Sequence, residues 1–193
     1  MCFYFQTGDI LAFAGRGWVS RRIALQTCTP CQLLRGRWIS HVGICAAVDS
    51  RSEAYLFEST TMVDEPCAIT GNRIDGVQAH WPDRRVAKCE GKVWLLRTRK
   101  HLAAAVRRRL GRFLQSCLGT PYDVPQALLS GTWLLNLTEF DAEDTSKLFC
   151  SEYVRLALED AGIVADTNAS IWTPARLVRE LVQIGLYQIT RIK

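Results

Sequence analysis

The sequence lacks any apolar run close to the ~20 residues that a membrane-spanning helix requires. Its first residues, MCFYFQTGDI, also lack the basic stretch and following apolar run that are typical of a secretory signal peptide. We therefore expect a cytoplasmic protein. Thiols stay reduced in most cells without secretion, so the even number of cysteines, eight, does not by itself predict disulfides.

Motifs for nucleic acids and metals are missing as well. There is no zinc-finger spacing, no RNA-binding aromatic motif and no long basic tail, so we expect no nucleic-acid partner. Cys28 and Cys31 form a CxxC pair, but no second pair follows at metal-ligand spacing. We expect neither a metal ion nor another cofactor, and we interpret the CxxC pair as a loop because Pro30 interrupts it.

Histidine is scarce, with only three in the chain. His101 lies beside Lys100 at the start of an amphipathic segment, so we expect it to be exposed. His80, in QAHWPD, should lie at a strand end or in a turn. His41 follows Ser40 and directly precedes the apolar strand HVGICAAV, which would hold it rigidly while leaving it reachable. His41 is therefore the candidate functional histidine, with an ordinary structural histidine as the alternative.

The composition that is present fits a globular protein. The chain has 193 residues, of which 48% are hydrophobic and 22% are charged. This is enough to bury a core without disulfides or metals, and wholesale disorder is not expected. No repeat, low-complexity tract or linker divides the chain, so we predict a single domain over residues 1–193.

Two kinds of hydrophobic pattern divide this domain. Short β-branched or apolar runs separated by Gly, Asp, Asn and Pro predict strands near residues 10–13, 42–48, 54–60, 76–81 and 93–98, with another at 186–192. Helical spacing predicts helices over residues 102–117, from Asp144–Ser146 to Gly162, and from Thr173-Pro174 to Gly185. A short helix is also expected in the first part of residues 18–38. The fold class is therefore α+β.

Cys150 is the candidate nucleophile. It follows the polar stretch DAEDTSK near the start of a predicted helix. A helix N-terminus favours a thiolate and offers free backbone N–H groups to an oxyanion. A buried cysteine on the core face of the helix is the alternative, since several cysteines of this chain lie in apolar strings.

Four motifs resemble the NlpC/P60 papain-like superfamily. GDILAF followed by SHVGICAAV is similar to that family's GD-strand and HVGI-strand, and LGTPYD followed by FCSEYVRLAL is similar to its GxPY and Cys segment. The histidine strands come first in this chain, whereas the cysteine segment comes first in the usual family. This order resembles the circularly permuted YiiX/YaeF-like branch, to which the lecithin:retinol acyltransferase-like enzymes are related. The resemblance covers roughly residues 7 to 160.

The resemblance implies a fold and a set of roles. The fold would be a permuted papain-like one, with an antiparallel sheet or barrel packed against a helical half that carries the nucleophile. Cys150 would be the nucleophile, His41 its base, and Glu58 the carboxylate that orients the imidazole from the next strand; the alternative for Glu58 is an ordinary edge-strand carboxylate. Tyr122 of GTPYD and Ser151 of CSE would lie at the oxyanion or substrate site.

Three functions remain open at this point. The first is a cysteine-dependent amidase or peptidase that acts through a thioester acyl-enzyme. The second is a lipid thioesterase or acyltransferase, which the apolar segment within Val124–Leu137 and the basic residues favour. The third is a non-catalytic binding module. The basic residues are Arg97, Arg99, Lys100, Arg107, Arg108, Arg109 and Arg112; they indicate a solvated helix face or contact with an anionic membrane surface.

Overall fold

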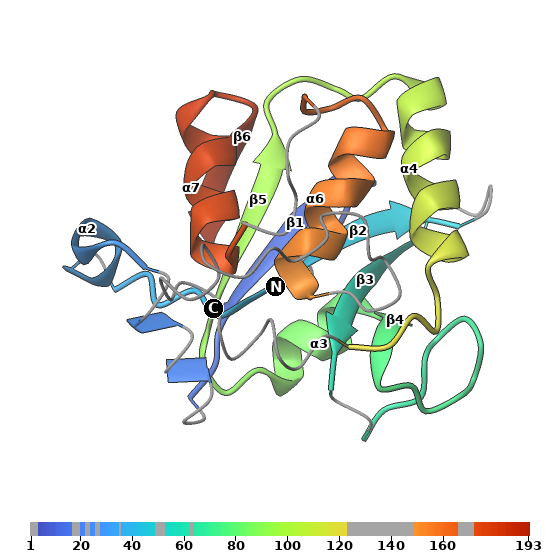
Figure 1. The fold of residues 1–193 in the computed structure, drawn as a ribbon, viewed down its shortest axis with the longest axis horizontal. Helices are drawn as coiled ribbons and strands as arrows, with labels where there is room; N and C mark the ends of the chain where they lie inside the picture. The colour runs from blue at the N-terminus through green and yellow to red at the C-terminus, as the bar shows by residue number, and fades with distance from the viewer. Residues whose placement is uncertain are drawn as a thin grey trace, which may run out of the picture.

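A computed structural model describes residues 4–16, 20–21, 24–25, 28–34, 36–48, 53–61, 64–122, 149–165 and 172–193. Its centre is a six-stranded sheet in which every neighbouring pair is antiparallel (Figure 1). The strands are β1 (Ile10–Ala14), β2 (His41–Ala47), β3 (Ala54–Thr60), β4 (Gly76–His80), β5 (Lys92–Thr98) and β6 (Tyr187–Arg191). Their order is β4-β3-β2-β1-β5-β6, which leaves β4 and β6 as edges. The sheet is therefore open, and the barrel alternative is wrong.

Both faces of the central strands are buried, and alternate residues serve different cores. On β1, Ile10 and Ala12 belong to a large cluster on one face, whereas Leu11 and Phe13 belong to a smaller cluster on the other. The period-2 geometry of a strand produces this division. It also explains why these strands are nearly continuous apolar runs and not alternating ones.

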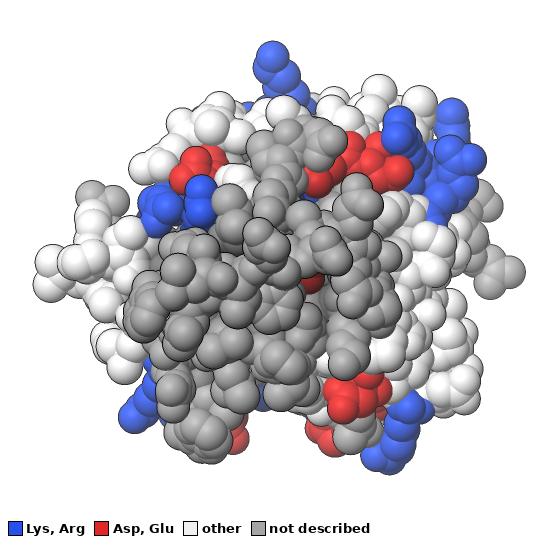
Figure 2. Space-filling model, in the orientation of Figure 1, with Lys and Arg blue, Asp and Glu red and all other residues white. Residues whose placement is uncertain are grey.

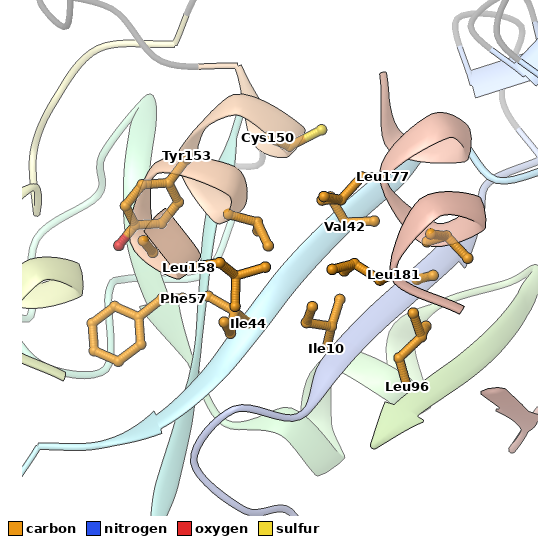
Figure 3. Packing of buried hydrophobic residues seen from close by; sticks show 14 of the residues in the cluster. Ile10, Val42, Ile44, Phe57, Leu96, Cys150, Tyr153, Leu158, Leu177 and Leu181 are labelled. Atoms are coloured by element: carbon orange, nitrogen blue, oxygen red, sulfur yellow. The ribbon is translucent and has the colours of Figure 1, made fainter. Parts of the chain in front are cut away.

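Three helices cover the face with the larger cluster (Figures 1 and 3). They are α4 (Ala104–Ser116), α6 (Cys150–Asp160) and α7 (Pro174–Gln183). Each contributes an apolar stripe, seen in Leu110 of α4, Leu158 of α6 and Leu181 of α7. The other face is partly covered by α3 (Pro82–Lys88), through Val86 and the adjoining Cys89. None of the helices in the described ranges is long and apolar enough to cross a membrane.

Several sequence predictions are confirmed. The pairing of residues 54–60 with the His41 strand is antiparallel. Helix α7 begins at Pro174 as predicted, because the Thr173 hydroxyl accepts a hydrogen bond from the Arg176 N–H. Helix α6 ends just before Gly162, whose φ of 69° lies in the left-handed region that glycine tolerates.

The CxxC segment is not a loop, so that prediction is wrong. Helix α2 (Pro30–Leu34) includes Cys31. Thr29 and Gln32 close its first turn with reciprocal hydrogen bonds, in which each side-chain oxygen accepts from the other residue's backbone N–H. Proline at the first position of a helix favours the start of a helix because its missing N–H is not needed there.

Two further boundaries differ from the predictions. Helix α6 begins at Cys150 and not at Asp144–Ser146, because Phe149 has an extended conformation (φ −81°, ψ 152°). Helix α3, which follows β4, was not predicted at all. A short helix was expected in the first part of residues 18–38; residues 20–21 and 24–25 are helical there, and the residues around them lie outside the described ranges.

Candidate active site

Cys150 is the first residue of α6. The Glu152 carboxylate accepts a hydrogen bond from the Phe149 N–H at 3.3 Å and so defines where the helix starts. Cys150 itself is fully buried, and Figure 3 shows its side chain directed from the start of α6 toward the α7 side. The first backbone N–H groups of any helix lack carbonyl partners within that helix. The thiol therefore lies where backbone donors and the helix dipole favour negative charge.

His41 is the first residue of β2. Its ring lies 5.8 Å from that of Phe13, a member of the smaller cluster, and the charge of Cys150, a member of the larger cluster, acts on it. Its Nε2 is 2.6 Å from Glu58 Oε2, which leaves Nδ1 for the thiol. The His41 side chain is 15% exposed, so the pair can be approached at the imidazole.

The charges of Cys150 and Glu58 favour the protonated form of His41, the imidazolium. Burial alone lowers the pKa of His41, but the negative charge of Cys150 and the hydrogen bonds to Cys150 and Glu58 outweigh it and raise the pKa to about 9. Below that pH, His41 can carry a proton and so stabilise a thiolate beside it, which is the nucleophilic form of a cysteine.

Glu58 is fully buried and accepts three charged or polar donors. They are His41 Nε2 on Oε2, and His80 Nδ1 at 2.7 Å and Arg85 Nε at 2.8 Å on Oε1. Burial opposes ionisation, but the charge of Arg85 and the hydrogen bonds from both histidines hold the pKa of Glu58 well below its ordinary value. β3 lies inside the sheet, so the interpretation of Glu58 as an edge-strand carboxylate is wrong.

Gly43 makes room for the contact between His41 and Glu58. It lies two residues after His41 and so on the same face of β2. A Cβ atom there would meet the Glu58 Cβ at 3.0 Å, the Phe57 carbonyl oxygen at 2.9 Å and the Leu56 side chain at 2.9 Å. Backbone atoms cannot move aside as a flexible side chain can, so position 43 must lack a side chain.

Replacing Gly43 with alanine is therefore expected to destabilise the protein by about 1–3 kcal/mol, the usual cost of overpacking a close-packed region. Urea denaturation would measure the change as a lower midpoint with an unchanged slope. A variant as stable as the wild type would show that this contact is looser than the structure indicates.

Tyr122 is brought to the site by a segment attached to the edge of the sheet. The Val77 N–H donates to the Thr120 carbonyl, and the Gly119 N–H donates to the Val77 carbonyl. Gly76 permits this approach, because a Cβ there would overlap the Thr120 carbonyl oxygen. The Tyr122 ring then packs edge-on against Phe149, with centroids 6.0 Å apart. Tyr122 thus contacts the residue that precedes Cys150.

Ser151 has a different environment from the one the resemblance implied. Its hydroxyl is buried and donates to the carbonyl oxygen of Trp172, which ties the start of α6 to the residues that lead into α7. That proton is not directed at a substrate. Any contribution of Ser151 to an oxyanion would have to come from its backbone N–H.

Sequence reasoning missed two residues of the site, His80 and Arg85. His80 is the last residue of β4, as expected for a strand end, but it is only 3% exposed and is not in a turn. Arg85 comes from the helix that was not predicted. Pro82 and Asp83 at its start were the available signal, because both residue types favour the first turn of a helix. His101 is exposed, as predicted.

The described residues do not form a metal site. Among them, no group of three or more His, Cys, Asp or Glu side chains is arranged to hold a metal ion. Around Glu58, both histidine nitrogens that face the carboxylate already bind it, and the Arg85 guanidinium occupies the same side. Free thiols among the described residues include Cys31, Cys45, Cys67, Cys89, Cys117 and Cys150.

Arginines of α4 lie on the surface. Arg108, Arg109 and Arg112 are exposed, and Arg109 pairs with Asp160 of α6 at 3.2 Å. Figure 2 shows basic side chains next to acidic ones on this part of the molecule. A solvated helix face accounts for this arrangement. The apolar segment Val124–Leu137, predicted to line the substrate site or complete the core, lies outside the described residues.

Comparison with known proteins shows which fold this chain shares but does not assign the chain to a family. No protein-family model matches the chain, and no match is found among curated proteins. Among solved structures, the chain is similar to the crystal structure of metalloprotein yiiX from Escherichia coli O157:H7 (DUF1105). The TM-score is 0.58 at 19% identity, over 99% of this chain and 98% of the other. The chain therefore shares the fold of yiiX along nearly its whole length.

Proposed function

We propose that this protein is a cysteine-dependent hydrolase of amide or peptide bonds, with Cys150 as nucleophile, His41 as general base and acid, and Glu58 as the orienting carboxylate. One observation carries the proposal: Glu58 binds one side of the His41 ring at 2.6 Å, and the charge of Cys150 acts on the same imidazole. A nucleophile, a base and a group that orients the base make up the constellation required for covalent catalysis.

In the first half of the reaction, the Cys150 thiolate attacks the carbonyl carbon, and the carbonyl oxygen takes the negative charge. Backbone N–H groups at the start of α6 are placed to stabilise that oxyanion, and Tyr122 lies beside them. The His41 imidazolium then gives its proton to the leaving nitrogen as the C–N bond breaks. The products are a free amine and a thioester on Cys150.

In the second half, neutral His41 removes a proton from water, and the hydroxide adds to the thioester carbonyl. When the C–S bond breaks, the acid leaves and Cys150 returns to its thiolate beside the imidazolium. Glu58, held ionised, stabilises the imidazolium in both halves and keeps Nε2 as the nitrogen that faces away from the thiol.

The likeness to yiiX and the permuted order of the four motifs support placing this chain in the circularly permuted branch of the NlpC/P60 superfamily, as a single domain over residues 1–193. The branch also includes acyl-transferring enzymes. Acyl transfer to an acceptor other than water would use the same Cys150 thioester, and it is the alternative outcome of the experiment below. A non-catalytic binding module would form no thioester.

The test is to incubate the protein with an activated acyl ester and to locate the acyl group by peptide mapping. We expect a mass increase on the peptide containing Cys150 that hydroxylamine removes, as it does for thioesters. Spontaneous loss in buffer indicates hydrolysis, whereas loss only after a hydroxyl or amine acceptor is added indicates acyl transfer. Absence of acylation at Cys150 would contradict both enzymatic functions.

Substitution of Glu58 by glutamine is expected to slow acylation by about 10- to 100-fold, because a lost orienting group costs less than a lost base. The exposed Glu53→Gln on the same hairpin is the matched control and should react as the wild type does. The measurement is the acylation rate at pH 7, with a thermal melt of each variant. An unchanged rate in Glu58→Gln would remove Glu58 from the mechanism.

A further inference from the structure

The Glu58 carboxylate binds two side chains in addition to His41. Oε2 serves His41 alone, whereas Oε1 accepts from both His80 and Arg85. These two come from β4 and α3, so three different elements converge on one side chain. His80 lies diagonally across the β3–β4 pair from Glu58, since Glu58 is opposite Gln78 and Leu56 is opposite His80.

The hydrogen bonds of His80 define its tautomer. Its Nδ1 faces an ionised carboxylate and must therefore carry the hydrogen. Its Nε2 is buried and has no hydrogen-bond partner among the described residues. A proton at Nε2 would be buried without an acceptor, which is costly. His80 is therefore a neutral donor to Glu58.

Arg85 is fixed from two sides. Its side chain is 8% exposed, its Nε binds Glu58, and its guanidinium carbon lies 4.6 Å from the centre of the Phe13 ring. The Phe13 ring also contacts His41. Arg85 cannot swing into solvent without giving up both the ion pair and the stacking contact, so its charge is permanently next to Glu58.

From this geometry we propose that Arg85 and His80 are positioning residues, which keep the Glu58 carboxylate ionised and aimed at His41 Nε2 so that the Cys150–His41 ion pair persists at lower pH. This inference rests on the proposed function, because it requires Cys150 to react as a thiolate beside an imidazolium. Neither residue contacts the thiol in the proposed reaction.

The other titratable groups near this carboxylate do not compete with Arg85. From β2 they are His41 and Cys45, from β4 His80, and from α3 Arg85 itself. Burial, together with the charges of Asp9 and Glu58, raises the pKa of the Cys45 thiol well above its ordinary value, so Cys45 stays neutral. Burial opposes the charge of Arg85, but the charge of Glu58 and its hydrogen bond outweigh burial and raise the pKa of Arg85, so its positive charge stays in place.

Replacing Arg85 with methionine retains most of the apolar stem over Phe13 but removes the charge. Loss of the Arg85 charge raises the pKa of Glu58, and a protonated Glu58 no longer stabilises the imidazolium that pairs with the thiolate. The acid limb of Cys150 alkylation by iodoacetamide is therefore expected to move up by about one pH unit, a tenfold lower rate at pH values below the midpoint.

Three variants separate positioning from mere packing. Arg84→Met removes the same charge from an exposed neighbouring position on α3 and should leave the acid limb unchanged. Arg85→Lys keeps a positive charge, so its acid limb should lie close to that of the wild type. His80→Phe removes a donor without changing a formal charge and should shift the limb in the same direction by less. His80→Phe decides the question if Arg85→Met does not fold.

The result that overturns the inference is an acid limb that stays in place in folded Arg85→Met, or in folded His80→Phe where Arg85→Met is unfolded. An equal shift in Arg84→Met would also overturn it, because any surface charge would then suffice. Failure of the proposed function looks different: the wild-type Cys150 itself would alkylate only with the pH dependence of an ordinary thiol.

Discussion

Cys150→Ser is expected to lower the rate of acyl-enzyme formation by about 10³-fold or more, because a hydroxyl beside histidine ionises far less readily than a thiol. The change is nearly isosteric at a fully buried position, so folding should be retained. The measurement is the acylation rate with an activated acyl ester, read by mass spectrometry of the intact protein.

The matched control is Cys31→Ser. Cys31 is exposed on α2, and by position alone it is the most accessible thiol among the described residues. If the reactivity of a thiol, and not its exposure to solvent, determines which cysteine is acylated, Cys31→Ser will acylate as fast as the wild type. Retention of labelling in Cys150→Ser together with its loss in Cys31→Ser would place the reactive thiol on α2 and refute the proposed function.

His41→Ala is expected to lower the acylation rate at pH 7 by about 10²- to 10⁴-fold, the usual contribution of a general base. Cys150 would then lack its proton acceptor and behave as a buried thiol. The exposed His101→Ala is the control and should have no effect. A His41→Ala protein that folds and acylates at the wild-type rate would exclude the Cys150–His41 pair.

The pH dependence gives a second measure of the same pair. The imidazolium of His41, with its pKa raised to about 9, is present below that pH and lost above it. An anionic reagent is attracted by the imidazolium, whereas a neutral one is not. The ratio of the iodoacetate rate to the iodoacetamide rate at Cys150 should therefore be high at pH 7 and fall as the pH rises through about 9.

In His41→Ala this ratio should be low and should not change between pH 7 and 10. Dividing the two rates cancels the fraction of thiolate, which affects both reagents equally. A ratio in the wild type that is constant across pH 9 would mean that His41 carries no proton beside Cys150 and would contradict the prediction.

Local chemistry in the sequence determined a large part of this fold. Apolar runs bounded by turn residues predicted all six strands, and Thr173-Pro174 predicted the start of α7, because capping and turn formation involve residues only a few positions apart. The pairing of Glu58 with the His41 strand was also predictable, since a short turn between two strands forces them to be antiparallel neighbours.

Boundaries were decided by particular contacts that a pattern does not contain. Asp144 and Ser146 are good N-cap types, yet helix α6 starts at Cys150, where the Glu152 carboxylate binds the Phe149 N–H. Pro30 suggested a loop, although proline equally suits the first turn of a helix, and Thr29 with Gln32 selected the helix. In both cases the local sequence was compatible with two structures, and one set of hydrogen bonds determined which of them formed.

Only the tertiary structure decided which groups meet. His41 and Cys150 are far apart in the chain, and packing of α6 on the sheet brings them close enough for their charges to interact. Propensity and spacing carry no information about Arg85 and His80 as partners of Glu58, because their contacts depend on how α3 folds back over β3 and β4. A buried carboxylate must find compensating donors wherever the fold supplies them, and those donors are fixed by three-dimensional packing and not by neighbouring residues.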